Sequence, residues 1–223
     1  MRELTTARLR LRSWSFDDAD FLFDMGSRWE VQRFIGRVPT VMADRAEAVA
    51  SIERRRARNQ HPVHGIWAIE TLADRTLVGT LLLKPIPASG GQSVQRADDV
   101  EIGWHLHPDH WGQGYATEAG AAVLAHAFAA GLSRVIAVTA PENIASQAVC
   151  RRLGMRHLGQ TGAYYDTTCE LFEAIGGPRS TPGCASVVLS ETERVQHAVE
   201  GIGQAVARGQ GREQGDVADC AGQ

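Results

Sequence analysis

Residues 101–119 read EIGWHLHPDHWGQGYATEA, and this stretch passes from a strand through a glycine-rich turn into a helix. Apolar residues alternate up to Leu106, as in a strand with one buried face. Pro108 then interrupts strand pairing, and beyond the turn small and apolar residues recur at helical spacing. Gly112 and Gly114 stand where the backbone turns sharply. We therefore expect the free N–H groups of the first helical turn to bind a phosphate or pyrophosphate.

The turn does not match the two common nucleotide-binding motifs. A P-loop requires a lysine after the second glycine, and none follows Gly114. A dinucleotide fingerprint requires a third glycine where Thr117 stands. A pair of glycines is also compatible with an ordinary helix start, so the turn alone does not identify its ligand.

A second segment indicates which class of ligand the turn binds. Residues 141–155 read PENIASQAVCRRLGM and follow the β-branched run 135–139, VIAVT. This order predicts a strand, a polar loop, a short helix and Gly154 as its C-cap.

Together the two segments resemble the GCN5-related N-acetyltransferase superfamily, and within it the branch typified by ribosomal-protein N-terminal acetyltransferases. The signatures are Trp-Gly-x-Gly-Tyr-Ala-Thr-Glu-Ala at 111–119 and Asn-x-x-Ser-x-x-Val-x-x-x-Leu-Gly-Met at 143–155. Residues 6–12 look like the opening strand of that branch, and 67–70 with 77–79 look like its middle hairpin. The resemblance covers roughly residues 3–174.

The resemblance implies a mixed α/β fold, with a strongly bent, mostly antiparallel sheet, a splayed central strand pair and flanking helices. It implies an acetyltransferase domain at 1–175. Its cosubstrate is acetyl-CoA, and no metal is expected. The implied cofactor-binding residues are Trp104, His105, Leu106, Gly112, Gln113, Gly114, Tyr115, Ala116, Thr117 and Asn143. Trp111 fills a slot that often holds Gln or Arg in the wider superfamily, although tryptophan is common there in the ribosomal branch.

The implied catalytic residues are Glu101 and Ser146. Ser146 matches a serine that protonates the leaving thiolate in the ribosomal branch, and a backbone-bonding role in the helix is the alternative. Many relatives have a tyrosine where Cys150 stands, and we expect this cysteine to be a core residue. Glu101 matches an acidic position that serves as general base in several relatives. His105 or water is an alternative base, and an ion pair with Arg8 or Arg10 is the structural alternative for the glutamate.

The N-terminal part predicts two further elements. Leu9 and Leu11 alternate with Arg8, Arg10 and Arg12, which indicates a strand with one buried face and one solvated, charged face. Residues 44–58 predict an amphipathic helix that ends in the run 54–56, RRR. We expect this run to be a solvated helix end, because cations suit the negative end of the helix dipole. An acidic partner is the alternative.

The C-terminal segment 176–223 differs in character from the rest. Residues 176–183, GGPRSTPG, read as a linker, and the stretch from Gly209 reads as a disordered tail. Between them a capping box at 190–193 precedes apolar residues at helical spacing, Val195, Val199, Ile202 and Val206. This predicted helix packs on a partner subunit in a homodimer, covers the sheet, or is partly disordered; the sequence leaves all three open.

Composition sets outer limits on function. The formal net charge of −3 over 223 residues argues against nonspecific nucleic-acid binding. We expect no membrane span and no signal peptide, because no long apolar run is present. The four cysteines lack a Cys-x-x-Cys spacing, so neither a zinc knuckle nor a disulfide framework is indicated. A cytoplasmic location follows as an expectation.

The resemblance therefore implies an N-acetyltransferase that moves an acetyl group to a primary amine through a ternary complex. A protein N-terminus is the favoured acceptor. Two alternatives stay open: an acetyltransferase of small amines or antibiotics, and a coenzyme-A-binding regulatory module without catalysis.

Overall fold

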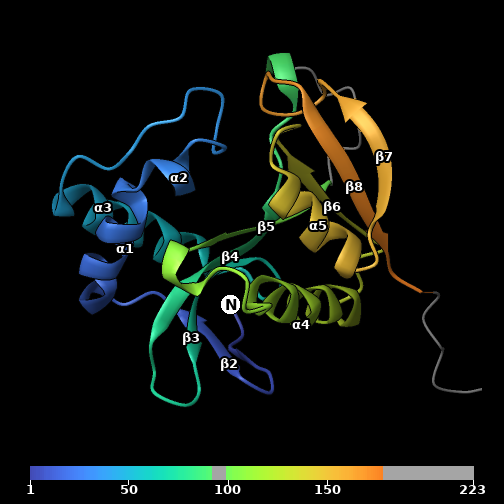
Figure 1. Ribbon diagram of the computed structural model, residues 1–223. Coiled ribbons are helices and arrows are strands. Elements are labelled where there is room, and N and C mark those ends of the chain that lie inside the picture. Colours follow the sequence, from blue (N-terminus) through green and yellow to red (C-terminus); the bar gives the residue numbers. More distant parts are fainter. Residues whose placement is uncertain (92–98, 178–223) are drawn as a thin grey trace, which may run out of the picture. The chain divides into compact units, whose positions relative to one another are not determined.

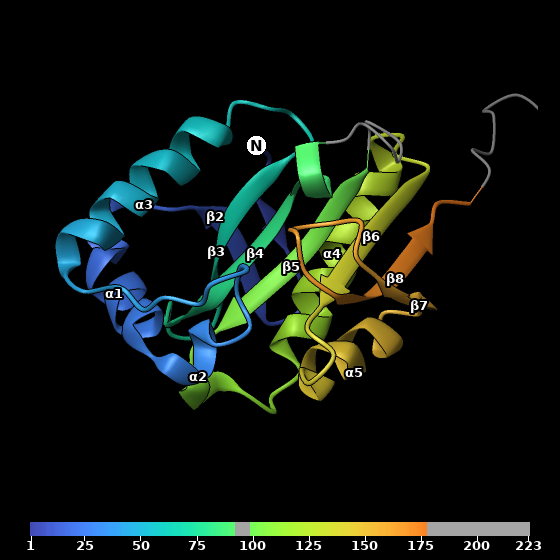
Figure 2. The ribbon, with the colours of Figure 1, turned by 90° about the horizontal axis from the view of Figure 1, so that it is seen from above.

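An eight-stranded sheet forms the centre of the computed structural model, which describes residues 1–91 and 99–177 (Figure 1). The strands are β1 (Leu4–Thr5), β2 (Leu9–Ser13), β3 (Gly65–Thr71), β4 (Leu77–Pro85), β5 (Val100–Leu106), β6 (Arg134–Thr139), β7 (Arg156–Thr161) and β8 (Cys169–Ile175). Their order across the sheet is β1-β2-β3-β4-β5-β6-β8-β7, as Figure 2 shows from above. Neighbouring strands are antiparallel except β5 and β6, which are parallel. The predicted mixed, mostly antiparallel sheet is confirmed.

Helices cover both faces of this sheet (Figure 1). They are η1 (Phe16–Asp18), α1 (Ala19–Ser27), α2 (Trp29–Gln32), α3 (Arg45–Arg58), η2 (Ser89–Gly91), η3 (Pro108–His110), α4 (Tyr115–Ala129) and α5 (Ile144–Arg152). On one face, Val123 and Ala127 of α4 pack with Leu9 and Leu11 of β2 in the larger core. On the other face, α1 and α3 form a second core with Trp14. Apolar side chains on both faces explain why β3 is buried along almost its whole length.

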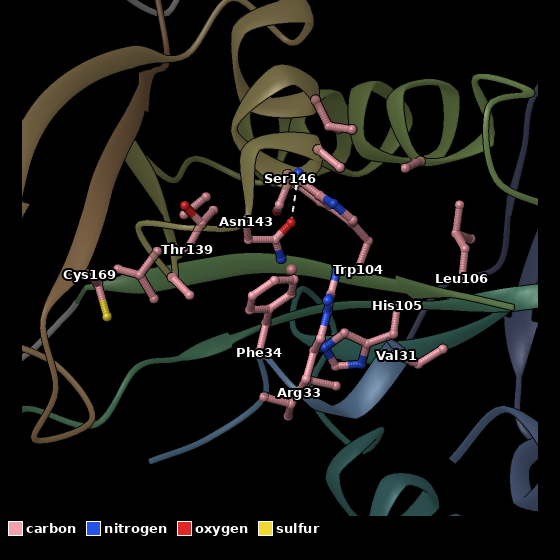
Figure 3. Close-up of a pocket in the computed structure, with 18 of the residues that line it drawn as sticks. Val31, Arg33, Phe34, Trp104, His105, Leu106, Thr139, Asn143, Ser146 and Cys169 are labelled. Atoms are coloured by element: carbon pink, nitrogen blue, oxygen red, sulfur yellow. Dashed lines mark hydrogen bonds between the residues drawn. The ribbon is translucent and has the colours of Figure 1, made fainter. Parts of the chain in front are cut away.

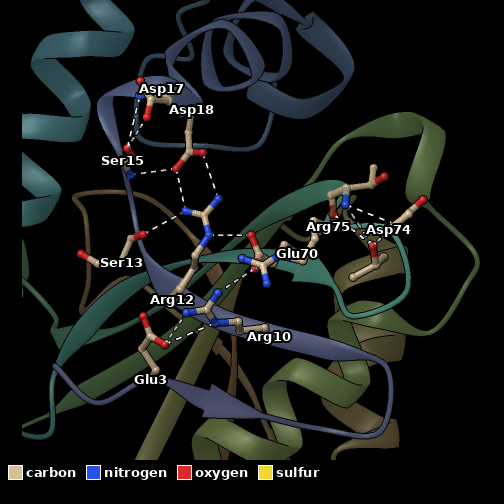
Figure 4. Close-up of polar contacts among 12 residues, drawn as sticks. Glu3, Arg10, Arg12, Ser13, Ser15, Asp17, Asp18, Glu70, Asp74 and Arg75 are labelled. Carbon is tan, nitrogen blue, oxygen red and sulfur yellow. Dashed lines mark hydrogen bonds and ion pairs between the residues drawn. The ribbon is translucent and has the colours of Figure 1, made fainter.

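The charged face of β2 differs from the prediction. The side chain of Arg12 is only 17% exposed, and its guanidinium binds both Glu70 (Nε–Oε2, 2.6 Å) and Asp18 (Nη1–Oδ2, 2.8 Å). Glu70 is buried and also contacts Arg10 and Arg75 (Figure 4). The antiparallel register places Arg10 opposite Glu70 on the neighbouring strand, so the arginines neutralise a buried carboxylate instead of extending into solvent. Only Arg8 keeps a side chain about half exposed.

The predicted helix at 44–58 is confirmed, but its basic end is not uniformly solvated. Arg54 is exposed, whereas Arg55 turns inward, where its guanidinium lies 5.0 Å from the centroid of the Trp14 ring. It donates hydrogen bonds to Ser51 Oγ (3.3 Å) and Thr80 Oγ1 (3.1 Å). Burial, with the nearby charge of Arg54, lowers the pKa of Arg55 to about 10. A cation is thus held between α3 and the sheet without a carboxylate partner among the described residues.

The middle of the sheet is where its strands separate. β5 is in register with β4 over its whole length, from Val100 to Leu106. Toward β6, only one pair of residues is in register, Glu101 with Ile136. This confirms the predicted splayed pair. The linker from residue 178, the predicted helix and the tail lie outside the described residues.

Candidate active site

A cavity of about 1360 Å³ lies where β5 and β6 part. It is lined by the ends of these strands, the starts of α4 and α5, the segment 29–39 and the turn before β8. Every predicted site residue lines it except Gln113, whose side chain amide donates instead to the carbonyl of Asp109 (3.4 Å). Residues predicted from two separate motifs therefore face one space, and Figure 3 shows part of it.

Trp111 stabilises the turn after β5 through two hydrogen bonds. Its indole Nε1 donates to the carbonyl of Leu106 at 2.9 Å. The backbone N–H of Trp111 donates to the carbonyl of Pro108 at 3.1 Å. The tryptophan thus ties the end of the strand to the start of the glycine turn, a role that depends on its ring nitrogen.

The glycine turn has the geometry that an anion cradle needs. Gly112 and Gly114 have φ of +74° and +80°, a region that favours glycine. Gly114 caps α4, and the first helical bond runs from Glu118 N–H to the Gly114 carbonyl (3.0 Å). Within the described ranges, the N–H groups from Gly112 to Thr117 have no hydrogen-bond acceptor. Six backbone donors therefore gather at the positive end of a helix.

Asn143 holds the start of α5 and faces the cavity. Its Oδ1 accepts a hydrogen bond from the backbone N–H of Ser146 at 3.1 Å, so Asn143 is the N-cap of α5. The amide nitrogen of Asn143 points into the cavity toward β5 (Figure 3). The bond engages only the backbone of Ser146, and the serine side chain lines the same cavity.

Cys150 lies one turn further along α5, in the larger core. It is fully buried, and burial raises the pKa of its thiol to about 12. A thiol with such a pKa is a poor proton donor near neutral pH. The prediction of a core cysteine is confirmed.

Glu101 is buried and bound, but not by the predicted arginines. Lys84 stands opposite it in the β4–β5 register, and the lysine ammonium contacts Glu101 Oε1. The hydroxyl of Tyr165 donates to the same oxygen, and Lys84 Nζ is 2.9 Å from that hydroxyl. Oε2 has no hydrogen-bond partner in the described part of the chain. The carboxylate is therefore fixed through one oxygen, while the other is available to a ligand.

Arg8 and Arg10 are engaged elsewhere, with Glu118 and with Glu3 and Glu70 respectively. The sequence interpretation also missed Lys84 and Tyr165. The pairing of Lys84 with Glu101 depends on the β4–β5 register, which the sequence pattern did not indicate. Tyr165 sits in a turn with φ of +58°, which no local pattern indicated. Burial, and then the charge of Glu101, raise the pKa of Tyr165, so its hydroxyl stays protonated at neutral pH.

The three histidines near β5 have different surroundings. His105 lies on the same strand face as Glu101 and is half-buried. Burial and the charges of Arg55 and Lys84 lower the pKa of His105 to about 4. His107 is buried and contacts Asp24 Oδ2 through Nε2 at 3.0 Å, while His110 lines the cavity. Only His105 and His110 are thus positioned to act in this space.

Within residues 1–91 and 99–177, no group of three or more His, Cys, Asp or Glu side chains is arranged to hold a metal ion. No helix there has the length and apolarity needed to cross a membrane.

Comparisons with known proteins agree with the geometry. A family model described as the acetyltransferase (GNAT) domain matches residues 8–156. The uncharacterized N-acetyltransferase YoaA of Bacillus subtilis is 33% identical over 172 residues, which are 74% of this chain and 92% of that protein.

Solved structures show the same fold. The acetyltransferase (GNAT family) from Bacillus anthracis has a TM-score of 0.63 at 20% identity, covering 78% of this chain and 99% of that one. The ribosomal L7/L12 alpha-N-protein acetyltransferase RimL, solved in complex with coenzyme A, has a TM-score of 0.62 at 18% identity. That match covers 78% of this chain and 98% of RimL.

Proposed function

This chain belongs to the GNAT acetyltransferase family and is an N-acetyltransferase, and we propose that it transfers the acetyl group of acetyl-CoA directly to a primary amine, with a protein N-terminus as the favoured acceptor. The observation that carries the proposal is the convergence of an anion cradle, the capping residue Asn143 and a buried Glu101 on one cavity. The similarity to RimL, an alpha-N-protein acetyltransferase solved in complex with coenzyme A, supports the choice of acceptor and cosubstrate.

The cradle fits the pyrophosphate of coenzyme A. A Cβ built on Gly112 would meet no atom within 4 Å, so the turn opens onto free space. Backbone N–H groups from Gly112 to Thr117 would bind the phosphate oxygens without any cationic P-loop lysine. The side of β5 that faces away from β4 offers the backbone of Trp104, His105 and Leu106 to the pantetheine arm, as an added strand would be bound. Asn143 would donate its amide to the same arm.

The bound thioester supplies an activated acetyl group, and the protein's own groups handle the protons. Glu101 receives the proton that the amine loses when its nitrogen forms the new C–N bond. The hydroxyl of Ser146 donates a proton to the sulfur as the C–S bond breaks. Tyr165 and Lys84 hold the carboxylate in place through Oε1, which leaves Oε2 for the amine. His105 is neutral at pH 7 and is retained as the alternative base.

We further propose that the enzyme is cytoplasmic, with a homodimer as the alternative to a monomer. Of the four cysteines, the two that the structure describes, Cys150 and Cys169, are buried free thiols, which are compatible with a reducing compartment.

The most informative experiment is an acetyl-CoA turnover screen against three amine classes: N-terminal peptides, polyamines and aminoglycosides. Release of free coenzyme A is measured for each class, with acetyl-CoA alone as the blank. Fastest turnover with peptides is expected. Preference for polyamines or aminoglycosides would replace the proposed acceptor, and tight coenzyme A binding without any turnover would indicate a regulatory module.

A further inference from the structure

The two faces of β5 serve different parts of the cavity. Asn143 and Ser146 lie on one side of the strand, and Val31, Arg33 and Phe34 lie on the other (Figure 3). Trp104 packs against the larger core, on the α4 side of the sheet. His105 and Glu101, at odd positions, face the opposite way, toward the segment 29–39. If the cosubstrate occupies the first side, as proposed above, the acceptor meets Glu101 from the second.

The acceptor side carries cations that no carboxylate among the described residues neutralises. Arg33 and Arg37 both line the cavity and are exposed, and neither forms an ion pair with a described residue. The guanidinium of Arg33 stacks on the Phe34 ring, 4.5 Å from its centroid. Stacking of this kind orients the guanidinium plane and leaves its N–H groups free at the edges. Those edges suit the two oxygens of a carboxylate.

A third cation lies behind this surface. Arg55 contacts Thr80, which is opposite His105 in the β4–β5 register. Its charge is close enough to His105 to help depress the pKa of that imidazole. Arg55 is bound only to hydroxyls and to an aromatic ring among the described residues. The positive charge of Arg55, which lies behind the cavity wall, would therefore attract an anion that enters the cavity.

Acidic groups do not cancel this charge. The acidic residues that line the cavity are Glu30, Glu101 and Glu142. Glu101 is paired with Lys84. Glu142 directly precedes Asn143, on the cosubstrate side of β5. Among the described residues that line the cavity, the exposed Glu30 is the one carboxylate left near Arg33, Arg37 and Arg55 on the acceptor side.

We propose that the acceptor is a primary amine that also carries a carboxylate, with the amine directed to Glu101 and the carboxylate to Arg33. The inference rests on the proposed acetyl transfer and specifies its substrate class. Two sources present this chemistry: a protein N-terminus followed by an acidic residue, and a free amino acid. Polycationic amines are disfavoured, because a second ammonium would meet Arg33 and Arg37 where the proposal seats a carboxylate.

The test compares acceptors that differ only in charge. With saturating acetyl-CoA, kcat/KM is measured for amidated Ser-Glu-Ala-Ala, Ser-Gln-Ala-Ala and Ser-Lys-Ala-Ala, and for serine against serinamide. We expect the acidic member of a series to be preferred by about 10- to 100-fold, as for a charge-assisted hydrogen bond. Preference within the peptide series identifies an acidic N-terminus, and preference for serine over serinamide identifies a free amino acid.

Variants test whether the preference for acidic acceptors arises from Arg33. Arg33→Glu should abolish or invert the charge preference, and Arg33→Gln should reduce it, while the affinity for coenzyme A measured by calorimetry stays near parental. Arg2→Glu makes the same charge change at an exposed residue outside the cavity and should leave the preference intact.

The inference is overturned if the parent protein acetylates all charge types equally, prefers the lysine peptide, or keeps its acidic preference in Arg33→Glu. Failure of the proposed function has a different signature: no acceptor of any charge is acetylated, and this would overturn the inference as well.

Discussion

The guanidinium of Arg8 lies beside Gly114, at the edge of the glycine turn. A Cβ built on Gly114 would lie 3.5 Å from Arg8 Nη2 and within 4 Å of no other atom. Glu118 fixes the arginine by accepting bonds from its Nε (2.7 Å) and from its backbone N–H (2.9 Å). The opening strand and the first turn of α4 are thus joined at the cradle, and a side chain introduced at Gly114 would lie beside the guanidinium of Arg8.

Gly114→Val should weaken coenzyme A binding by about tenfold or more, because a β-branched residue does not readily adopt a φ of +80° and its side chain would enter the cradle. Calorimetry with coenzyme A measures the effect. Gly159→Val is the matched control: Gly159 has a φ of +89° and an open Cβ position on β7, outside the cavity. Equal affinity of Gly114→Val and the parent would show that the turn is not the cradle.

Glu101→Gln should lower kcat by about two to four orders of magnitude, because the amide keeps the shape of the side chain and cannot accept the amine proton. Coenzyme A affinity should stay near parental. Steady-state kinetics on the best acceptor provides the measurement, and Glu170→Gln, a carboxylate outside the cavity, serves as control. Weaker binding with unchanged kcat would instead assign Glu101 a structural role.

Ser146→Ala should also lower kcat by about two to four orders of magnitude if the hydroxyl protonates the leaving sulfur. The cap of α5 should survive, since Asn143 binds the backbone N–H of residue 146 and not its side chain. Asn143→Ala removes the cap at a cost of about 1 kcal/mol and also removes the proposed contact with the pantetheine arm, so its loss of stability, and not its kcat, is the reference for the cap. A Ser146→Ala protein with parental kcat would leave the serine with its backbone role alone.

The stability of the protein should fall between pH 6.5 and pH 4 partly through His105. Its pKa drops from 6.5 in the unfolded chain to about 4 in the folded protein, so in this window the unfolded state binds a proton that the folded state does not. The loss is at most about 3 kcal/mol. Urea unfolding of the parent and of His105→Asn at pH 7 and pH 5 measures how much of the lost unfolding free energy comes from His105. An identical pH dependence in both proteins would contradict the burial of His105.

Much of this fold was predictable because local patterns and packing agree. The alternation of Leu9 and Leu11 and the Gly112 and Gly114 turn each reflect a constraint that acts within a few residues. The two motifs also converge on one cavity as expected, since β5 and β6 are adjacent and both lead into helices.

The polar partners were harder to predict, because they depend on the register of distant strands. Glu70 attracts Arg10 and Arg12 from the neighbouring strand, and nothing near these arginines in sequence announces a buried carboxylate. Arg55 is similar: three consecutive arginines look equivalent, and only the position of Trp14 and Thr80 turns one of them inward. Tyr165 reaches Glu101 from a chain segment that follows it by more than sixty residues.

Truncation after Gly177 should leave a folded protein that binds coenzyme A, because β8, the last strand among the described residues, ends at Ile175. The removed segment contains four apolar residues in its predicted helix, worth about 1.5 to 3 kcal/mol each if fully buried, before ordering costs. Some loss of stability or a change in oligomeric state is expected. Circular dichroism and gel filtration check this, and an unfolded product would place the predicted helix in the main core.

The single registered pair between Glu101 and Ile136 divides the hydrogen-bond ladder into two mechanical halves, β1 to β5 and β6 to β8. Side-chain packing holds the halves together, yet the backbones of β5 and β6 pair at only one position. A ligand that contacts both β5 and β6 should therefore stabilise the association of the two halves. At a concentration one hundred times its Kd it would add about 2.7 kcal/mol to the free energy of unfolding, and amide exchange along the inner edges of β5 and β6 should slow most.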